Sequence, residues 1–362
     1  MTLSEKTAEA TIHGVVDPNT GSPLGSKSVR SLSLVGGHLK VTVAVGYPVQ
    51  TLGAAVKEAI AAALLPLEGI AVVEATVQAQ IKPHKVQSGL TLLKGIRNVI
   101  AVASGKGGVG KSTTAVNLAL ALQAEGARVG ILDADIYGPS QPMMLGVKGN
   151  PETHEDGNSM KPLQGHGLQV MSVGFLIDPD QPMVWRGPMV TQALEQLLRD
   201  THWDDLDYLI VDMPPGTGDV QLTLAQKVPV TGAVIVTTPQ DIALLDARKG
   251  FRMFEKVGIP ILGVVENMSV HVCSHCGHEE PIFGEGGAAR MCADFGTELI
   301  GALPLDIRIR QEADSGCPTV VADPDSAPAL TYRKIAQRVA IKLAQRGENP
   351  SVKFPKIVVQ NT

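Results

Sequence analysis

The sequence predicts an α/β fold, with a mostly parallel sheet covered by helices on both faces and a small α+β domain in front of it. Three observations support this fold class. Short apolar runs of strand length alternate with helical stretches from residue 98 onward. Acidic residues follow several of these runs, at the sheet edge where open α/β proteins place their sites. A glycine-rich loop separates the first run from the helix that follows it.

The glycine-rich loop runs from Gly105 to Ser112. The apolar run before it, Val99 to Ala103, suits a buried parallel strand, and helical spacing begins after Lys111. The Gly-x-x-x-x-Gly-Lys-Ser spacing is the phosphate-loop pattern of P-loop NTPases, in which backbone N–H groups and a helix N-terminus face an anion. Lys111 would reach the β- and γ-phosphates of ATP, and Ser112 would hold Mg²⁺. The predicted nucleotide contacts in the loop are Gly105, Lys106, Gly107, Gly108, Val109, Gly110, Lys111, Ser112 and Thr113.

The composition limits the possible classes of protein. The chain has 362 residues, enough for two domains, and a formal net charge of -5 that gives no reason to expect a nucleic-acid partner. No apolar run approaches the ~20 residues of a membrane span, and residues 1–10 show no secretory signal. Four cysteines are too few for a secreted disulfide framework. We therefore expect a cytoplasmic protein without stable membrane association.

The region before the glycine-rich loop reads as strand, strand, helix, strand. Gly36-Gly37 separates two apolar runs, 29–35 and 39–45, and predicts a hairpin. An alanine-rich helix over 49–65 and a strand over 70–81 follow. The predicted division of the chain is a small α+β domain over 1–85, a connector over 86–97, a P-loop ATPase domain over 98–347 and a C-terminal tail over 348–362.

Carboxylates end two of the predicted strands in the second domain. Asp212 ends the apolar run 208–211 and precedes Pro-Pro-Gly-Thr-Gly. Together with a phosphate loop, an aspartate in this position forms a Walker B arrangement and would orient the Mg²⁺ shell. Asp133 and Asp135 follow the run 128–132. The remaining predicted strands are 168–173, 233–237, 261–265 and 299–302, with helices over 189–198 and 241–257 between them.

Cys273-Ser-His-Cys276 is a second chemical feature, in a polar loop after the run 261–265. Two thiolates at this spacing can ligate one metal centre, and three interpretations compete. A redox dithiol would need the pair at a helix N-terminus. A zinc site could recruit a histidine from the same loop, with His271, His275 and His278 as candidates. In the third, two cysteines from each of two subunits form the four-thiolate set of a [4Fe–4S] cluster.

From Asn98 to Ala344 the sequence resembles the Mrp/ApbC-type iron–sulfur cluster carriers, which are related to the MinD/ParA ATPases. The matching segments are Gly-Lys-Gly-Gly-Val-Gly-Lys-Ser with its deviant Walker A lysine Lys106, Asp-Ala-Asp-Ile-Tyr-Gly-Pro-Ser, Trp-Arg-Gly-Pro, Asp-Met-Pro-Pro-Gly-Thr-Gly-Asp, Glu-Asn-Met-Ser and Cys-x-x-Cys. The first region resembles the small domain often fused in front of such carriers. It has Asp17-Pro18 but lacks the acidic stretch that usually follows, so we assign it no functional residue.

The resemblance implies an ATPase that binds ATP and Mg²⁺ and works as a homodimer. Lys106 would cross the dimer interface to the partner's nucleotide, Asp135 would position the attacking water, and Asn267 would read adenine. Cys273 and Cys276 of both chains would bridge a [4Fe–4S] cluster. The expected partners are apo iron–sulfur proteins, which would receive the cluster, and cluster-assembly scaffold proteins.

The alternative function is that of a MinD/ParA-like positioning ATPase whose Cys-x-x-Cys binds zinc structurally. Residues 332–346 carry five basic residues, no acid, and an apolar stripe of Ile335, Val339 and Leu343. Such a helix could lie on a membrane, but packing on the sheet with a solvated basic side is the simpler expectation. Cys292 is expected to be a small core residue, and Cys317 to be structural or idle.

Overall fold

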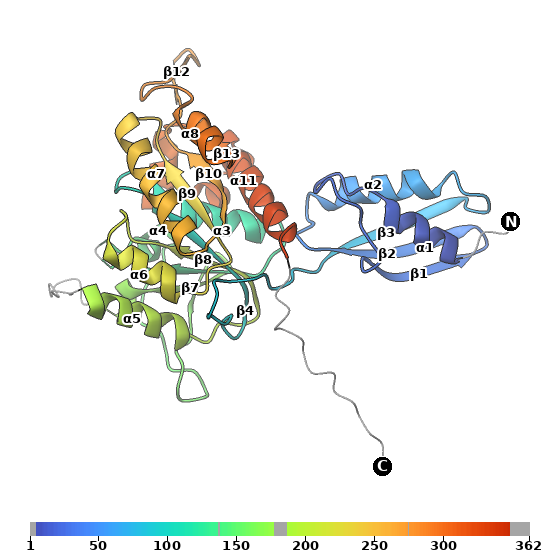
Figure 1. Cartoon of the computed structure of the whole chain (residues 1–362), viewed down its shortest axis with the longest axis horizontal. Helices are drawn as coiled ribbons and strands as arrows, with labels where there is room; N and C mark the ends of the chain where they lie inside the picture. The colour runs from blue at the N-terminus through green and yellow to red at the C-terminus, as the bar shows by residue number, and fades with distance from the viewer. Residues whose placement is uncertain (1–4, 137, 177–186, 274, 348–362) are drawn as a thin grey trace.

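The computed structural model describes residues 5–136, 138–176, 187–273 and 275–347. Figure 1 shows a small three-stranded domain beside a larger α/β domain, which confirms the predicted fold class. The tail over 348–362, Trp185 and Arg186 of the Trp-Arg-Gly-Pro motif, Tyr137 and Ser274 lie outside the described residues.

The small domain has a sheet of order β1-β2-β3. β1 and β2 form the predicted antiparallel hairpin, and β2 pairs with β3 in parallel. Helix α1 was not predicted: it buries only Ala8 and Ile12, so its apolar face is too narrow to stand out in the sequence. The elements are α1 (Glu5–Gly14), β1 (Val29–Val35), β2 (His38–Val45), α2 (Gly53–Leu64) and β3 (Val72–Ala79).

The large domain is built on an eight-stranded sheet of order β13-β10-β9-β4-β8-β5-β7-β6. All pairs from β13 to β7 are parallel, as predicted, and the short edge strand β6 is antiparallel to β7. β4 begins at Ile96, inside the predicted connector, because Ile96 already pairs with Leu206 of β8. The strands are β4 (Ile96–Ala103), β5 (Val129–Asp133), β6 (Leu163–Gly165), β7 (Leu168–Ser172), β8 (Leu206–Asp212), β9 (Gly232–Thr237), β10 (Ile261–Glu266) and β13 (Leu299–Ala302).

Helices cover the sheet, as Figure 1 shows. α3 and α11 pack against each other, and α7 and α8 pack over β9 and β10. The helices are α3 (Lys111–Ala124), α4 (Gln141–Met144), α5 (Gly187–Arg199), α6 (Asp219–Lys227), α7 (Asp241–Lys256), α8 (Gly287–Phe295), α9 (Ile307–Asp314), α10 (Thr319–Ala322) and α11 (Ala327–Ala344), with a 3₁₀ turn η1 (Val173–Phe175). A two-stranded ribbon, β11 (His271–Val272) and β12 (Glu279–Glu280), follows β10.

The basic helix at the C-terminal end of the described chain is α11, and its apolar stripe is buried. Ile335, Val339 and Leu343 are each at most 1% exposed and belong to the main core. The packing alternative is therefore correct, and this stripe is not available to a membrane surface. None of the described helices combines the length and the apolar character that a membrane-spanning segment needs.

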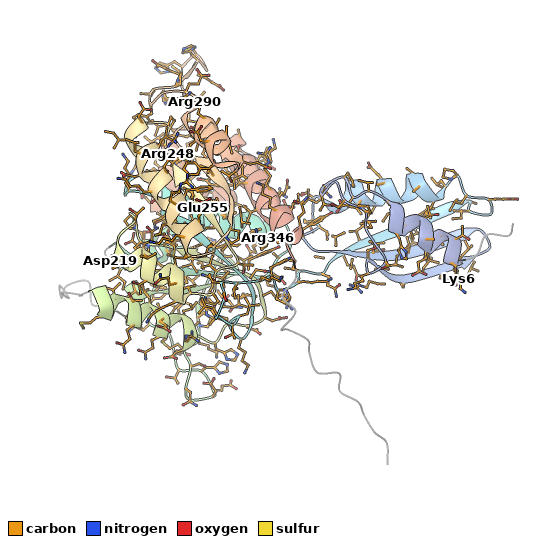
Figure 2. The ribbon with its side chains drawn as sticks, viewed as in Figure 1. Lys6, Asp219, Arg248, Glu255, Arg290 and Arg346 are labelled. Carbon is orange, nitrogen blue, oxygen red and sulfur yellow. The ribbon has the colours of Figure 1, made fainter. Side chains whose placement is uncertain are left out.

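The two domains are joined by polar contacts near the C-terminal end of α3 and along α11. The Glu125 carboxylate accepts hydrogen bonds from Thr51 of the small domain and pairs with Arg333 at 2.9 Å. Gln345 donates to the Thr20 carbonyl at 2.7 Å, and Figure 2 shows Arg346 at the same junction. These contacts fix the small domain beside α11.

Candidate nucleotide and thiol sites

The phosphate loop connects β4 to α3, as the sequence predicts. Gly108 and Gly110 adopt φ values of +81° and +82°, in the left-handed region that favours glycine. Gly110 is the N-cap of α3 and no side chain caps this helix, so the first backbone N–H groups can face an anion. A side chain at Gly105 would overlap the backbone of α7 at Asp246. The loop is thus held between two helices.

Lys111 is the centre of a buried charge cluster. Its side chain is 6% exposed, and its ammonium group forms an ion pair with Asp212, whose side chain is 0% exposed. The Nζ atom also lies 3.1 Å from Ser112 Oγ and 3.7 Å from Asp135 Oδ2. The predicted residues Lys111, Ser112, Asp135 and Asp212 therefore meet at the carboxyl ends of β4, β5 and β8.

Gln141 is a site residue that the sequence reasoning missed. Its Nε2 donates to Asp212 Oδ2 at 2.9 Å and to the Ser112 carbonyl at 3.1 Å. It begins the short helix α4, and its side chain is buried. Gln141 thus fixes one carboxylate oxygen of Asp212. No sequence signal marks it, because its role depends on how the loop after β5 folds back onto the sheet.

Asp133 and Asp135 have different surroundings. Asp133 accepts hydrogen bonds from the backbone N–H groups of Asp135, Ser140 and Gln141 at 2.9–3.2 Å, so it organises the loop after β5. Burial, followed by the negative charge of Asp212, raises the pKa of Asp133 well above its usual range. Asp135 is the carboxylate beside Lys111. This geometry is compatible with the assignment of Asp135, rather than Asp133, as the catalytic residue.

Asn267 lies against the phosphate loop. Its Nδ2 donates to the Val109 carbonyl at 2.9 Å, while its backbone N–H donates to the Thr237 carbonyl at 2.8 Å. A side chain at Gly110 would collide with the same Nδ2 atom. The structure thus brings Asn267 to the nucleotide site, and its role toward adenine stays a prediction. Lys106 is half-buried, and its carbonyl accepts a hydrogen bond from Ser104 Oγ at 2.8 Å.

Cys273 and Cys276 lie in the turn of the β11–β12 ribbon, which projects from the large domain on the side away from α5 (Figure 1). Cys273 N–H donates to the His278 carbonyl at 2.9 Å, and Gly277 N–H donates to the Cys273 carbonyl at 2.9 Å. Gly277 has φ +70°. The backbone N–H groups of His275 and Cys276 and the Cys276 thiol lower the pKa of Cys273, which favours the thiolate that binds metals.

No third ligand joins the two thiols in the described part of the chain. The one group of three or more His, Cys, Asp or Glu side chains found there with metal-sized spacing lies elsewhere. In the described part of the chain, His271, His275 and His278 are thus not already grouped with the two thiols at metal-sized spacing. Cys292 is 3% exposed on the core-facing side of α8, as expected, and burial raises its pKa to about 11. Cys317 is half-buried in the short connection between α9 and α10.

Comparison with known proteins places these features in a family. The sequence profile of the NUBPL iron-transfer P-loop NTPases matches residues 95–340. The iron–sulfur cluster carrier protein of Escherichia coli K12 is 56% identical over 292 residues, 81% of this chain and 79% of the relative. The chain therefore belongs to the family of NUBPL iron-transfer P-loop NTPases. A second profile, described as iron–sulfur cluster assembly protein, matches residues 5–77 of the small domain.

Two further relatives match between 71% and 87% of this chain. The iron–sulfur cluster carrier protein of Synechocystis is 44% identical over 87% of this chain and 91% of its own length. The iron–sulfur cluster transfer protein NUBPL of Mus musculus is 53% identical over 71% of this chain and 81% of its own length. These relatives favour the carrier interpretation over the positioning ATPase.

Solved structures support the fold. An Archaeoglobus fulgidus nucleotide-binding protein in complex with ADP is 36% identical, with a TM-score of 0.56, and covers 64% of this chain and 90% of its own. The Pyrococcus furiosus cell division ATPase MinD has a TM-score of 0.51 at 24% identity, covering 67% of this chain and 98% of its own. The second likeness shows the shared P-loop fold alone.

Proposed function

We propose that this family member is a cytoplasmic ATPase that carries a [4Fe–4S] cluster between two subunits and transfers it to apoproteins. One observation carries the proposal: an exposed turn presents Cys273 and Cys276 with no third ligand in the described part of the chain. The names of the relatives point to the same activity. Its partners would be cluster-assembly scaffold proteins as donors and apo iron–sulfur proteins as recipients.

The thiol pair supplies half of a four-thiolate set. A two-fold axis places the same surface of two subunits face to face, so it can bring two such pairs to one cluster. The cluster is cargo in this mechanism. The cluster would sit on a short ribbon of two-residue strands at the surface, which suits transfer because the recipient's thiolates can approach from solvent. A cluster buried in the core would have no such route.

The nucleotide site would bind ATP through the phosphate loop and Lys111. The Ser112 hydroxyl and the Asp212 carboxylate would hold Mg²⁺, which prefers oxygen ligands of this kind and neutralises phosphate charge when bound. Asp135 would orient the attacking water, and Asn267 would contact adenine. Lys106 would reach the partner's nucleotide across the dimer interface. Lys111 would exchange its ion pair with Asp212 for the phosphates.

A direct chain connection links the two sites. β10 leads to Asn267, which contacts the phosphate loop at Val109, and the chain then continues through Ser269 to β11 and Cys273. Ser269 is anchored to the Leu303 carbonyl by its backbone N–H at 2.9 Å and by its hydroxyl at 3.0 Å. A change in how Asn267 contacts the loop would therefore be transmitted to the ribbon. Hydrolysis would act as the timer of loading and release.

The experiment that tests the carrier function measures iron and sulfide in the anaerobically purified or reconstituted protein. We expect a brown protein with about four iron atoms per dimer. Cys273→Ser and Cys276→Ser should each remove the cluster and leave the nucleotide site folded, while Cys317→Ser should have little effect. Colourless, monomeric protein after reconstitution would contradict the proposal. A zinc site would instead give about one zinc per chain and depend on His275 or His278.

The role of Lys106 across the interface has its own test. Lys106→Ala should retain Mg·ATP binding and lose hydrolysis. Mixing Lys106→Ala subunits with Asp135→Ala subunits should then restore activity at one of the two sites in each mixed dimer. A mixture no more active than either variant alone would contradict the role in trans.

A further inference from the structure

A turn between α4 and β6 is fastened to the chain just after α5, on the side of the large domain opposite the cysteine ribbon (Figure 1). Within the turn, His154 N–H donates to the Ser159 carbonyl at 2.7 Å. Met160 N–H donates to the Asp200 carbonyl at 2.6 Å, and His202 N–H donates to the Met160 carbonyl at 2.8 Å. The backbone thus holds His154 and His202 in fixed positions side by side.

The side chains of His154, Asp156 and His202 converge at this junction. Asp156 Oδ2 lies 3.5 Å from His154 Nδ1 and 3.9 Å from His202 Nδ1. The two imidazole rings are stacked, with centroids 3.8 Å apart and an interplanar angle of 9°. One ligand atom from each residue falls within 4.8 Å of the others. Ligands bonded to a tetrahedral zinc ion at ~2.1 Å are about 3.4 Å apart, so the donor atoms are close enough to share one ion once the stacked rings tilt apart and turn their nitrogens toward it.

The donor atoms have the charge and the access that a metal site needs. The Ser159 hydroxyl and the backbone N–H groups of Asn158 and Ser159 donate to Asp156 and keep the pKa of its carboxyl well below the usual range. Asp156 N–H donates to His154 Nδ1 at 3.3 Å, a long hydrogen bond that a metal ion bound at this nitrogen would replace. The side chains are 23%, 44% and 40% exposed for His154, Asp156 and His202, which leaves a route for an ion and for water ligands.

We propose that His154, Asp156 and His202 bind one divalent first-row transition-metal ion. Two imidazoles and one carboxylate form a set that Zn²⁺ and Fe²⁺ both accept, with coordination positions left open to solvent. The exposure makes the ion exchangeable. Such an ion would also fasten the 151–162 turn to the end of α5. This site shares no residue with the nucleotide or cysteine sites, so it does not rest on the proposed carrier function.

The test uses the full-length Cys273→Ser/Cys276→Ser protein, in which the thiol pair cannot bind the added metal. Equilibrium dialysis against Zn²⁺, followed by metal analysis, should find one zinc per chain beyond any in a His202→Gln version of the same protein. Affinity should fall at least about tenfold in His202→Gln and in Asp156→Asn. The matched control is His38→Gln, which removes a histidine paired with a single carboxylate, Glu74, at 3.5 Å, and should leave binding unchanged.

Trp203 provides a second readout. It is buried next to His202, and a surface pocket is lined by Asp156, His202 and Trp203 together. In a Trp185→Phe background it is the one remaining tryptophan of the chain. Ni²⁺ should quench its fluorescence in the parent protein and not in His202→Gln, and anaerobic Fe²⁺ should compete with Ni²⁺. The thermal midpoint should rise with Zn²⁺ only when all three ligands are present. Equal metal binding and equal quenching in the parent and His202→Gln proteins would overturn the proposal.

Discussion

The phosphate loop and the cysteine ribbon are the two chemical centres of the large domain, and they are built in opposite ways. The phosphate loop follows β4, a central strand of an eight-stranded sheet. The two main charges of the nucleotide site, Lys111 and Asp212, are buried and paired within one chain. The ribbon consists of two-residue strands, and Cys276 is exposed. The first centre brings its charges together within a single chain, while the second, under the proposed function, supplies two of the four thiolates of a shared cluster.

The difference indicates which parts of the function one chain can perform. Buried charges are costly unless they are paired, so the nucleotide site must be assembled when the domain folds. The thiols of the surface ribbon carry no such cost, so the domain can fold before any cluster binds to them. Binding of nucleotide and assembly of the cluster should therefore be separable by mutation.

The largest expected effect is that of Lys111→Ala. Hydrolysis of ATP should fall by about a thousandfold, because the β- and γ-phosphates lose the cation nearest to them. Phosphate release by the purified protein measures this. Lys148→Ala, at an exposed position, is the matched control and should keep full activity. Reconstituted iron content should stay normal in Lys111→Ala, provided that circular dichroism shows a folded protein. Normal turnover would remove Lys111 from the mechanism.

The next largest effect is a difference in alkylation rate between Cys273 of the ribbon and the buried Cys292. The pKa of Cys292 is raised to about 11 by burial, while that of Cys273 is lowered by neighbouring N–H groups. The thiolate is the reactive form, and each pKa unit changes its population about tenfold. At neutral pH, iodoacetamide should label Cys273 more than about a hundredfold faster than Cys292, as followed by peptide mass spectrometry. In denaturant the rates should become similar, and a persistent difference there would contradict this explanation.

Much of the fold and of the nucleotide site could be predicted from the sequence, because the strongest sequence signals are local. Gly105 to Ser112 fixes a loop, and the apolar runs fix the parallel strands, so the P-loop cluster could be predicted residue by residue. Gln141 could not, since nothing near it in sequence shows that its amide reaches Asp212. The cluster of His154, Asp156 and His202 escaped for the same reason: its members come together only when the turn docks beside α5.

A smaller effect separates two glycines of the phosphate loop. Gly108 and Gly110 have the same positive φ, but only at Gly110 would a side chain meet Asn267. Gly108→Ala should cost about 1–2 kcal/mol of backbone strain. Gly110→Ala should cost about 1 kcal/mol more, because Asn267 must abandon its hydrogen bond to Val109. Titration with a fluorescent ATP analogue should show affinity about fivefold weaker in Gly110→Ala than in Gly108→Ala. Equal affinities would mean that the Asn267 contact does not matter to binding.

The smallest effect tests the ribbon, where a glycine is needed for backbone conformation alone. Gly277 has φ +70°, and a Cβ atom at this position would have no neighbour within 4 Å, in contrast to one at Gly110. Asparagine tolerates this conformation better than alanine, so Gly277→Asn should hold the cluster nearly as well as the parent, and Gly277→Ala should lose about 1 kcal/mol. Loss of visible absorbance under an iron chelator should then be several-fold faster for Gly277→Ala, with ATP hydrolysis unchanged in both variants. Equal rates of loss in the two variants would contradict a role for the backbone conformation of Gly277 in holding the cluster.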